Sequence, residues 1–262
     1  MIGPLRVTRE GSIARVSLSR PDVRNAFNAE LIAELRARFE ELAELPPEEL
    51  RGVVLAGDGA TFSAGADVTW MRAAQQLSVE ENEADASRMA AMFATIDACP
   101  VPIITRVQGA ALGGGMGLCA VSDIVLATAD ARFGFTEVKL GILPSVISPF
   151  VLVKIGESHA RALFATGERF DAERARQVGL VHEVLPDEAA LDARIDTLLG
   201  ELSSAAPGAL RAAKSLIREL RGLDPDDARA LTTERIARLR TAPEGVEGLA
   251  AFLEKRPPAW RE

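Results

Sequence analysis

The sequence predicts an α/β fold that changes, toward the C-terminus, into a wholly helical region. Strand-like apolar runs alternate with helix-period segments over the first part of the 262 residues. From about Glu157 onward almost every periodic signal is helical. Strands that alternate with helices at this spacing are typical of α/β proteins. We therefore expect a core over residues 1–197 and a C-terminal helical region over residues 198–262.

The first predicted elements are a strand, a turn and a helix. Ile13–Leu18 alternates apolar and polar positions as a half-buried strand does, and the proline of Arg20–Asp22 indicates a turn. Asn28 is a suitable N-cap for the helix that follows. Apolar residues of that helix recur at the helical period: Leu31, Ile32, Leu35, Phe39 and Leu42.

The middle of the chain continues the alternation. Gly52–Ala56 and Val101–Val107 are predicted strands because both are apolar runs that end near turn residues. Val79–Ala98 is predicted to be a helix with methionine, phenylalanine and isoleucine on one face. Met116–Ala120 predicts a short helix, and Ile124–Ala127 another short strand.

Composition excludes several classes of protein. The net charge of −8 argues against a nucleic-acid partner, which would favour a basic face. Cys99 and Cys119 form neither a disulfide framework nor a zinc motif. The N-terminus has no signal-peptide core, and no run of about 18 apolar residues follows it. We expect a cytoplasmic protein with no membrane partner.

Two glycine-rich turns are the most informative motifs, Ser63–Asp67 and Ala110–Gly117. Turns made of glycine and alanine let the backbone approach a ligand, because no side chain intervenes. If both turns direct N–H groups at one point, they form an oxyanion hole that stabilises an enolate. Glu137 follows in the sequence, and a carboxylate beside such a hole can move protons at the carbon next to the carbonyl.

With these turns, an ordered set of landmarks resembles the enoyl-CoA hydratase/isomerase (crotonase) superfamily over nearly the whole chain. The landmarks are Arg24–Asn28, Phe62–Asp67, Val107–Gly115, Ser122–Asp123, Phe133–Pro144, Gly179–Val181 and Phe252–Arg256. Each is weak alone, but their order and spacing together are strong evidence. The resemblance implies a crotonase-type spiral of β-β-α turns with a C-terminal helical oligomerisation region, assembled as a homotrimer or homohexamer. It also implies an acyl-CoA substrate.

The resemblance further implies roles for individual residues. Backbone N–H groups of Ala66 and Gly114 would hold the thioester carbonyl, and Glu137 would transfer protons. The implied substrate-binding positions are Arg24, Ala26, Ala64, Asp67, Val68, Gly113, Gly117, Phe252 and Lys255. In the family, the segment matching Arg24 and Ala26 lies along the adenine and phosphates, whereas residues like Phe252 and Lys255 reach coenzyme A from the same or a neighbouring subunit. Coenzyme A is carried by the substrate, and no metal, nucleotide or flavin cofactor is expected.

One departure from the family pattern concerns the reaction type. Two-glutamate hydratases of the family carry a glutamate at the position of Gly117, which cannot transfer a proton. Either Glu137 alone serves hydration, or the enzyme shuttles a proton between carbons, as the family's 3-enoyl to 2-enoyl-CoA isomerases do. Glu81, Glu83 and Asp85 are interpreted mainly as a solvated helix face, although one of them could replace the missing carboxylate.

The segment Pro144–Phe150, together with Ala64–Met71, Gly113–Leu118 and Phe170–Ala172, resembles a bacterial methylglutaconyl-CoA-hydratase-like subgroup. We therefore favour a hydratase that acts on a 2-enoyl-CoA, such as a branched methylglutaconyl-CoA. The isomerase, a thioester hydrolase and a non-catalytic or RNA-contacting protein remain the alternatives. Asp67 is interpreted chiefly as a turn and helix-cap residue, because an aspartate after such a turn usually fixes it.

Overall fold

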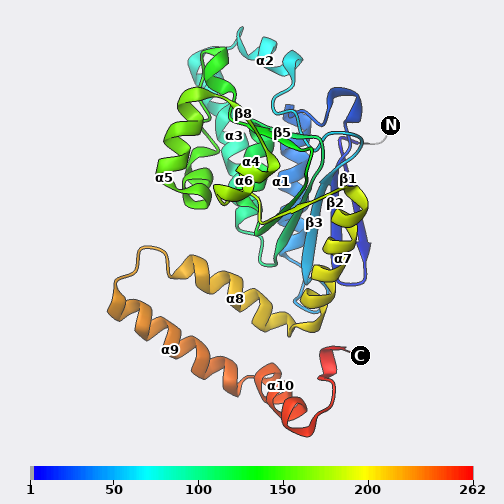
Figure 1. The fold of residues 1–262 in the computed structure, drawn as a ribbon. Helices are drawn as coiled ribbons and strands as arrows, with labels where there is room; N and C mark the ends of the chain where they lie inside the picture. Colours follow the sequence, from blue (N-terminus) through cyan, green and yellow to red (C-terminus); the bar gives the residue numbers. More distant parts are fainter. Residues whose placement is uncertain (1–2, 262) are drawn as a thin grey trace.

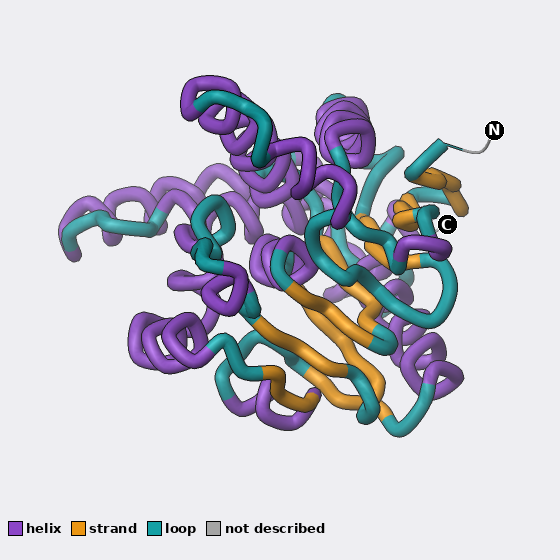
Figure 2. The backbone as a smooth tube through the Cα atoms, turned by 90° about the horizontal axis from the view of Figure 1, so that it is seen from above, coloured by secondary structure: helices purple, strands orange, loops and turns teal. Residues whose placement is uncertain are grey.

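The computed structural model describes residues 3–261 and has two sheets with helices around them (Figures 1 and 2). The larger sheet has the order β1-β2-β3-β4-β6-β9, and the smaller has the order β5-β7-β8. The β1–β2 and β7–β8 pairs are antiparallel, whereas the other pairs are parallel. The strands are β1 (Leu5–Glu10), β2 (Ile13–Leu18), β3 (Gly52–Gly57), β4 (Ile103–Val107), β5 (Ala110–Leu112), β6 (Ile124–Thr128), β7 (Arg132–Gly134), β8 (Arg169–Asp171) and β9 (Glu183–Leu185).

The helices follow the strands in a repeating spiral, as predicted. They are α1 (Ala29–Ala43), α2 (Val68–Ala74), α3 (Val79–Asp97), α4 (Gly114–Val121), α5 (Ser148–Thr166), α6 (Ala172–Gln177), α7 (Glu188–Ser204), α8 (Pro207–Glu219), α9 (Pro225–Thr241) and α10 (Pro243–Glu254). Short 3-10 helices are η1 (Pro21–Val23), η2 (Glu137–Leu140) and η3 (Ala259–Arg261). Parallel bridges Phe27–Ala66 and Ser63–Ala111 join successive turns of the spiral.

Local sequence signals account for the two helices that matter most for the site. Asn28 caps α1, because its side chain accepts a hydrogen bond from the Leu31 N–H. A capping box of Ser78 and Glu81 begins α3. The apolar face of α3 includes Phe93, which is fully buried in the main core. The predicted helices at these positions are confirmed.

The prediction of almost wholly helical structure after Glu157 is wrong for two short strands. β8 pairs with β7, and β9 pairs with β6. Each has only three residues, so its stability comes from pairing with a distant strand and its own sequence shows no clear period. His182 lies directly before β9 and is exposed. Its Nδ1 accepts a hydrogen bond from the Val125 N–H at 2.9 Å, and partial loss of solvation around the ring lowers its pKa.

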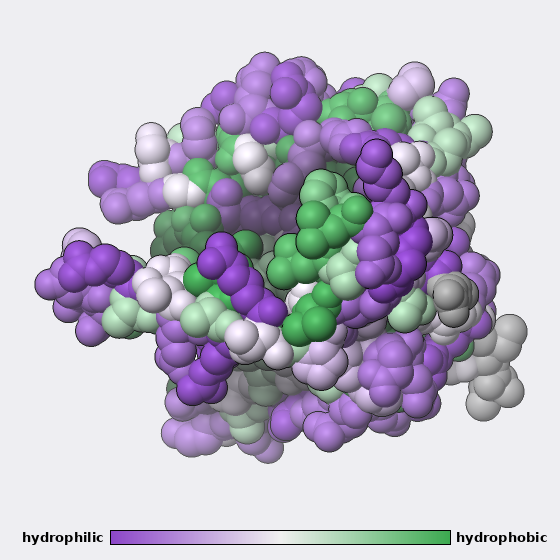
Figure 3. All heavy atoms as spheres, turned by 90° about the horizontal axis from the view of Figure 1, so that it is seen from below, coloured by the Kyte–Doolittle hydropathy of each residue, from purple (hydrophilic) through white to green (hydrophobic). Residues whose placement is uncertain are grey.

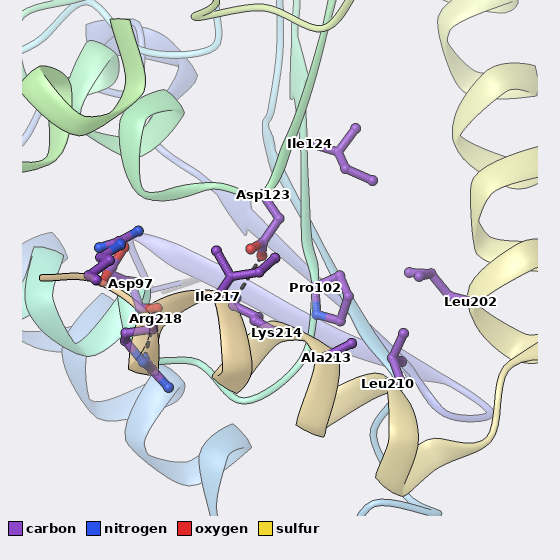
Figure 4. Close-up of a pocket in the computed structure, with 11 residues that line it drawn as sticks. Asp97, Pro102, Asp123, Ile124, Leu202, Leu210, Ala213, Lys214, Ile217 and Arg218 are labelled. Carbon is purple, nitrogen blue, oxygen red and sulfur yellow. Dashed lines mark hydrogen bonds and ion pairs between the residues drawn. The ribbon is translucent and has the colours of Figure 1, made fainter. Parts of the chain in front are cut away.

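The C-terminal helices separate from the body after α7. The expected boundary between residues 197 and 198 falls inside α7, where Leu199 is still buried in an apolar cluster with the sheet. After Ala205, α8, α9 and α10 extend away from the body (Figure 1). Two side chains tie α8 to the core: Arg211 donates to the Leu45 carbonyl, and Lys214 forms a 2.6 Å ion pair with Asp123 (Figure 4).

Candidate active site

The two glycine turns meet in space. A Cβ placed on Gly65 would lie 3.0 Å from the Leu112 carbonyl oxygen and 3.7 Å from the Gly113 Cα. Gly65 and Gly113 both have positive φ angles, of +90° and +50°, which L side chains rarely adopt. Glycine is therefore needed at both positions, for the backbone conformation and at Gly65 also for the close approach.

Both residues predicted to supply the oxyanion-hole amides line one cavity. The Phe27–Ala66 bridge uses the N–H groups of Phe27 and Asp67, and within residues 3–261 the Ala66 N–H donates to no backbone carbonyl. Gly114 is the first residue of α4, where N–H groups lack intrahelical partners and the helix dipole favours negative charge. Ala66 and Gly114 line the same cavity of about 330 Å³. This arrangement can stabilise an oxyanion that forms between the turns.

Glu137 lies against the second turn at the start of η2. Its Oε1 would be 3.3 Å from a Cβ placed on Gly113. Its Oε2 is buried and has no hydrogen-bond partner among the described residues. Burial raises the pKa of this carboxyl above the ordinary glutamate value, because the charged form loses solvation. A carboxyl with a raised pKa can both donate and accept a proton nearer neutral pH.

The rest of the cavity wall is mostly apolar. Apolar residues of α2, α3, η2 and the segment after η2 form it: Trp70, Met71, Ala74, Ala86, Met89, Leu140, Ile142, Leu143, Pro144, Val146 and Ile147. Its uncharged polar residues are Asn82, Thr136 and Ser145. Asp85 and Glu137 are the only charged residues in this wall, within the part of the chain described, and no lysine or arginine lines it. Such a wall suits an acyl chain.

Gly117 lies behind the cavity wall and does not line it. A Cβ at this position would lie 2.7 Å from Phe93 Cζ and closer still to Ile147 Cγ2. Phe93 and Ile147 therefore fill the space into which a side chain at position 117 would project. The resemblance implied that Gly117 contacts the substrate, but these two side chains separate Gly117 from the cavity.

The remaining predicted residues of the first turn surround its base. The Ala64 N–H donates to the Arg24 carbonyl at 2.9 Å, which joins these two predicted positions. Asp67 caps α2 by accepting from the Thr69 N–H, and a hydrogen bond from Arg20 lowers the pKa of the Asp67 carboxyl. Val68, at the start of α2, is exposed and outside the cavity wall.

Sequence reasoning missed two polar residues that support this turn. Arg20 reaches Asp67 at 2.8 Å and also donates to the Ala26 carbonyl. Asn25 is fully buried, and its amide donates to the carbonyls of Asp58 and Thr61. Neither belongs to a catalytic motif. The only sequence signal for a supporting role was their polar character within the Arg20–Asn28 segment.

Phe252 and Lys255 do not reach the cavity of their own chain. Both lie at the end of α10, and α10 and α2 are at opposite ends of the molecule (Figure 1). Phe252 is 81% exposed, which is unusual for a side chain of its size. Their predicted contact with coenzyme A would therefore have to be made with another subunit.

A second hollow lies between α8 and the larger sheet (Figure 4). Its volume is about 280 Å³, and its wall includes Asp123 and Lys214. These two charges already pair with each other, and Asp123 also accepts from the Ile103 N–H. Its polar groups thus tie α8 to the body. In residues 3–261 no helix is both long and apolar enough to span a membrane, and no three His, Cys, Asp or Glu side chains gather as a metal site.

Comparison with known proteins adds independent findings. The chain matches the sequence profile described as Enoyl-CoA hydratase/isomerase over residues 8–262. It is 31% identical to the 2,3-dehydroadipyl-CoA hydratase of Escherichia coli, over 98% of each chain. It is similar in structure to an enoyl-CoA hydratase from Shewanella pealeana, with a TM-score of 0.93 and 40% identity over 98% of this chain and 96% of that one. AtuE of Pseudomonas aeruginosa gives a TM-score of 0.95 with 35% identity, over 99% of this chain and 100% of that one.

Proposed function

The chain belongs to the enoyl-CoA hydratase/isomerase family, and from this premise we propose that it adds water to the double bond of a 2-enoyl-CoA. The observation that carries the proposal is that both glycine turns and Glu137 border one largely apolar cavity. The family acts on acyl-CoA substrates. Coenzyme A then enters as part of the substrate, and the acyl chain occupies the cavity.

In this mechanism the thioester oxygen lies between the N–H groups of Ala66 and Gly114. When an oxygen nucleophile attacks the β-carbon, negative charge moves onto the thioester oxygen and an enolate forms. Donors fixed at that position stabilise the enolate more than the neutral substrate, so they lower the barrier. Glu137 then gives a proton to the α-carbon. Its raised pKa supports this role, because the protonated form persists at higher pH than in an exposed glutamate.

Isomerisation of a 3-enoyl-CoA to a 2-enoyl-CoA is the second candidate. The observation in its favour is the closed space at Gly117, which removes the usual position of a second carboxylate. One base that takes a proton from one carbon and returns it to another is sufficient for that reaction.

Turnover of enoyl-CoA substrates in oxygen-18 water separates the two reactions. We expect mass spectrometry to find the label in a hydroxyacyl-CoA product. An unlabelled product with a migrated double bond would instead establish the isomerase. A suitable panel of substrates for this assay contains crotonyl-CoA, a branched enoyl-CoA and methylglutaconyl-CoA. No basic residue lines the cavity among the described residues, so a cation that pairs with the free carboxylate of methylglutaconyl-CoA would have to come from outside this wall.

A homotrimer or homohexamer is also proposed. The C-terminal helices and the turn between α8 and α9 expose large apolar residues: Ile217, Leu223, Ile236, Val246, Leu249, Phe252 and Leu253. Figure 3, seen from below, shows apolar side chains beside a hollow. Exposed apolar side chains in such number are typical of an interface. Light scattering at micromolar concentration tests this assembly, and a monomeric mass would contradict it.

A further inference from the structure

One face of α3 runs along α4 and can be followed residue by residue. Met89 Cε lies 3.1 Å from the position of a Cβ on Gly114, and Phe93 Cζ lies 2.7 Å from that of a Cβ on Gly117. Residues four apart share a helix face, so Asp85, Met89 and Phe93 form one row. Asp85 is therefore about 6 Å further along α3 than Met89, one turn beyond the oxyanion amide of Gly114.

Asp85 is the only acidic residue of α3 that reaches the cavity, among those described. It is 8% exposed, although the sequence suggested a solvated position. Its Oδ1 accepts a 2.8 Å hydrogen bond from Arg88, whereas its Oδ2 has no hydrogen-bond partner within residues 3–261. Glu81 is engaged in the capping box, and Glu83 is exposed. The structure thus selects one of the three acids that the sequence left as alternatives.

The two cavity carboxylates have different surroundings. Glu137 is buried with one oxygen unpartnered, which favours its protonated form. Asp85 is instead ion-paired to the Arg88 guanidinium at 2.8 Å. A pair of carboxyl groups in such different environments suits one acid and one base.

We propose that Asp85 is the second carboxylate of this site, and that its Oδ2 holds the water that adds to the β-carbon. This inference rests on the proposed hydratase function. It assigns to a side chain of α3 the work that the position of Gly117 cannot perform.

The step balances with water as the only co-reactant. Asp85 takes one proton from the water, whose oxygen forms a bond to the β-carbon. The electron pair of the carbon–carbon double bond moves to give the thioester enolate, held by the N–H groups of Ala66 and Gly114. Glu137 delivers its proton to the α-carbon, and the thioester carbonyl re-forms. Asp85 then releases its proton to solvent while Glu137 takes one up, which restores the starting state.

Asp85→Asn tests the proposal, because it keeps the size of the side chain and removes the base. Two reactions are measured: hydration of crotonyl-CoA, and exchange of the α-protons of butyryl-CoA in deuterium oxide, followed by NMR. Exchange needs the oxyanion amides and Glu137 but adds no water. We expect hydration to fall by at least about 100-fold, whereas exchange stays within about threefold of the wild type. Glu83→Gln is the matched control on the same helix, and both rates should be unchanged.

The possible outcomes are distinct. Equal loss of both rates, with a lowered melting temperature, would assign Asp85 a structural role and overturn the proposal. Unchanged hydration of crotonyl-CoA would also overturn it. If that result came with faster turnover of a dicarboxyl enoyl-CoA, Asp85 would instead be an electrostatic wall of the acyl pocket. Wild-type protein that exchanges α-protons but hydrates no enoyl-CoA would refute the proposed hydratase itself, a result that can be read without the variant.

Discussion

Gly114 and Gly117 lie three residues apart on α4, and their surroundings differ sharply. Gly114 borders the cavity, whereas Gly117 is sealed behind Phe93 and Ile147. Glu137 stands on the open side, close to the turn that holds Gly114. The backbone and side-chain parts of the proposed site can therefore change independently. The amides come from the fold, whereas each carboxylate position depends on what packs around it.

The largest expected effect tests the open side. Glu137→Gln keeps the size and hydrogen-bonding capacity of the side chain but removes the proton-transfer group. We expect turnover of an enoyl-CoA to fall by about 100-fold or more, since general acid–base catalysis typically contributes 10²–10⁴-fold. Affinity for a saturated acyl-CoA, measured by calorimetry, should change little, because the amides and the apolar wall remain.

Glu168→Gln is the matched control, because Glu168 is an exposed carboxylate outside the cavity wall. It should leave turnover unchanged. If Glu137→Gln retained full activity, the proton-transfer group would not lie on the open side of α4.

The next effect tests the closed side. Gly117→Glu forces a side chain against Phe93 and Ile147, so the native packing must shift. Overpacking of a core typically costs about 1–3 kcal/mol of unfolding free energy, and a buried unpaired carboxylate adds to that cost. We expect the midpoint of chemical denaturation to fall and turnover to gain nothing, because the carboxylate cannot reach the cavity.

Two further variants separate space from charge. Gly117→Ala introduces the steric contact without a charge and should account for only part of the loss. In a Phe93→Ala background, where the ring is removed, Gly117→Glu should cost less than it does alone. A Gly117→Glu protein as stable as the wild type would mean that the space is not closed.

Sequence reasoning predicted the open side better than the closed one. The two turns and Glu137 are short motifs. The alternation of strands and helices predicted an α/β fold, and the family resemblance implied the β-β-α spiral. The sealing of Gly117 arises where α3 packs on α4, and no local signal specifies that contact. The helical spacing of Asp85, Met89 and Phe93 was visible, but periodicity alone does not show what a helix face touches.

The same limit applies to the supporting shell of the first turn. Arg20 and Asn25 have partners that are dozens of residues away in the sequence. Their role follows from burial and hydrogen bonds, which only the folded chain reveals. The end of α10 shows the opposite error. The family resemblance implied a site role for Phe252, but in the single chain Phe252 is exposed and α10 is far from the cavity.

The smallest expected effect concerns the stability cost of Glu137. Its pKa is raised in the folded protein by burial, which outweighs the opposing backbone hydrogen bond. The folded state therefore holds this proton to a higher pH than the unfolded state does. It follows that the contribution of Glu137 to stability is fully present below the unfolded-state pKa of about 4.3 and is lost as pH rises through the folded-state pKa.

Glutamine at position 137 has no charge to desolvate, so the stability of the variant does not fall with this titration as the pH rises. We expect Glu137→Gln to melt higher than the wild type at pH 8, by roughly 2 °C or more, and the difference to vanish near pH 4. Differential scanning calorimetry across that range measures it, with Glu168→Gln as the surface comparison. A variant less stable than the wild type at pH 8 would mean that the carboxylate is well solvated. In that case the open side of α4 would differ from the closed side by access to water as well as by packing.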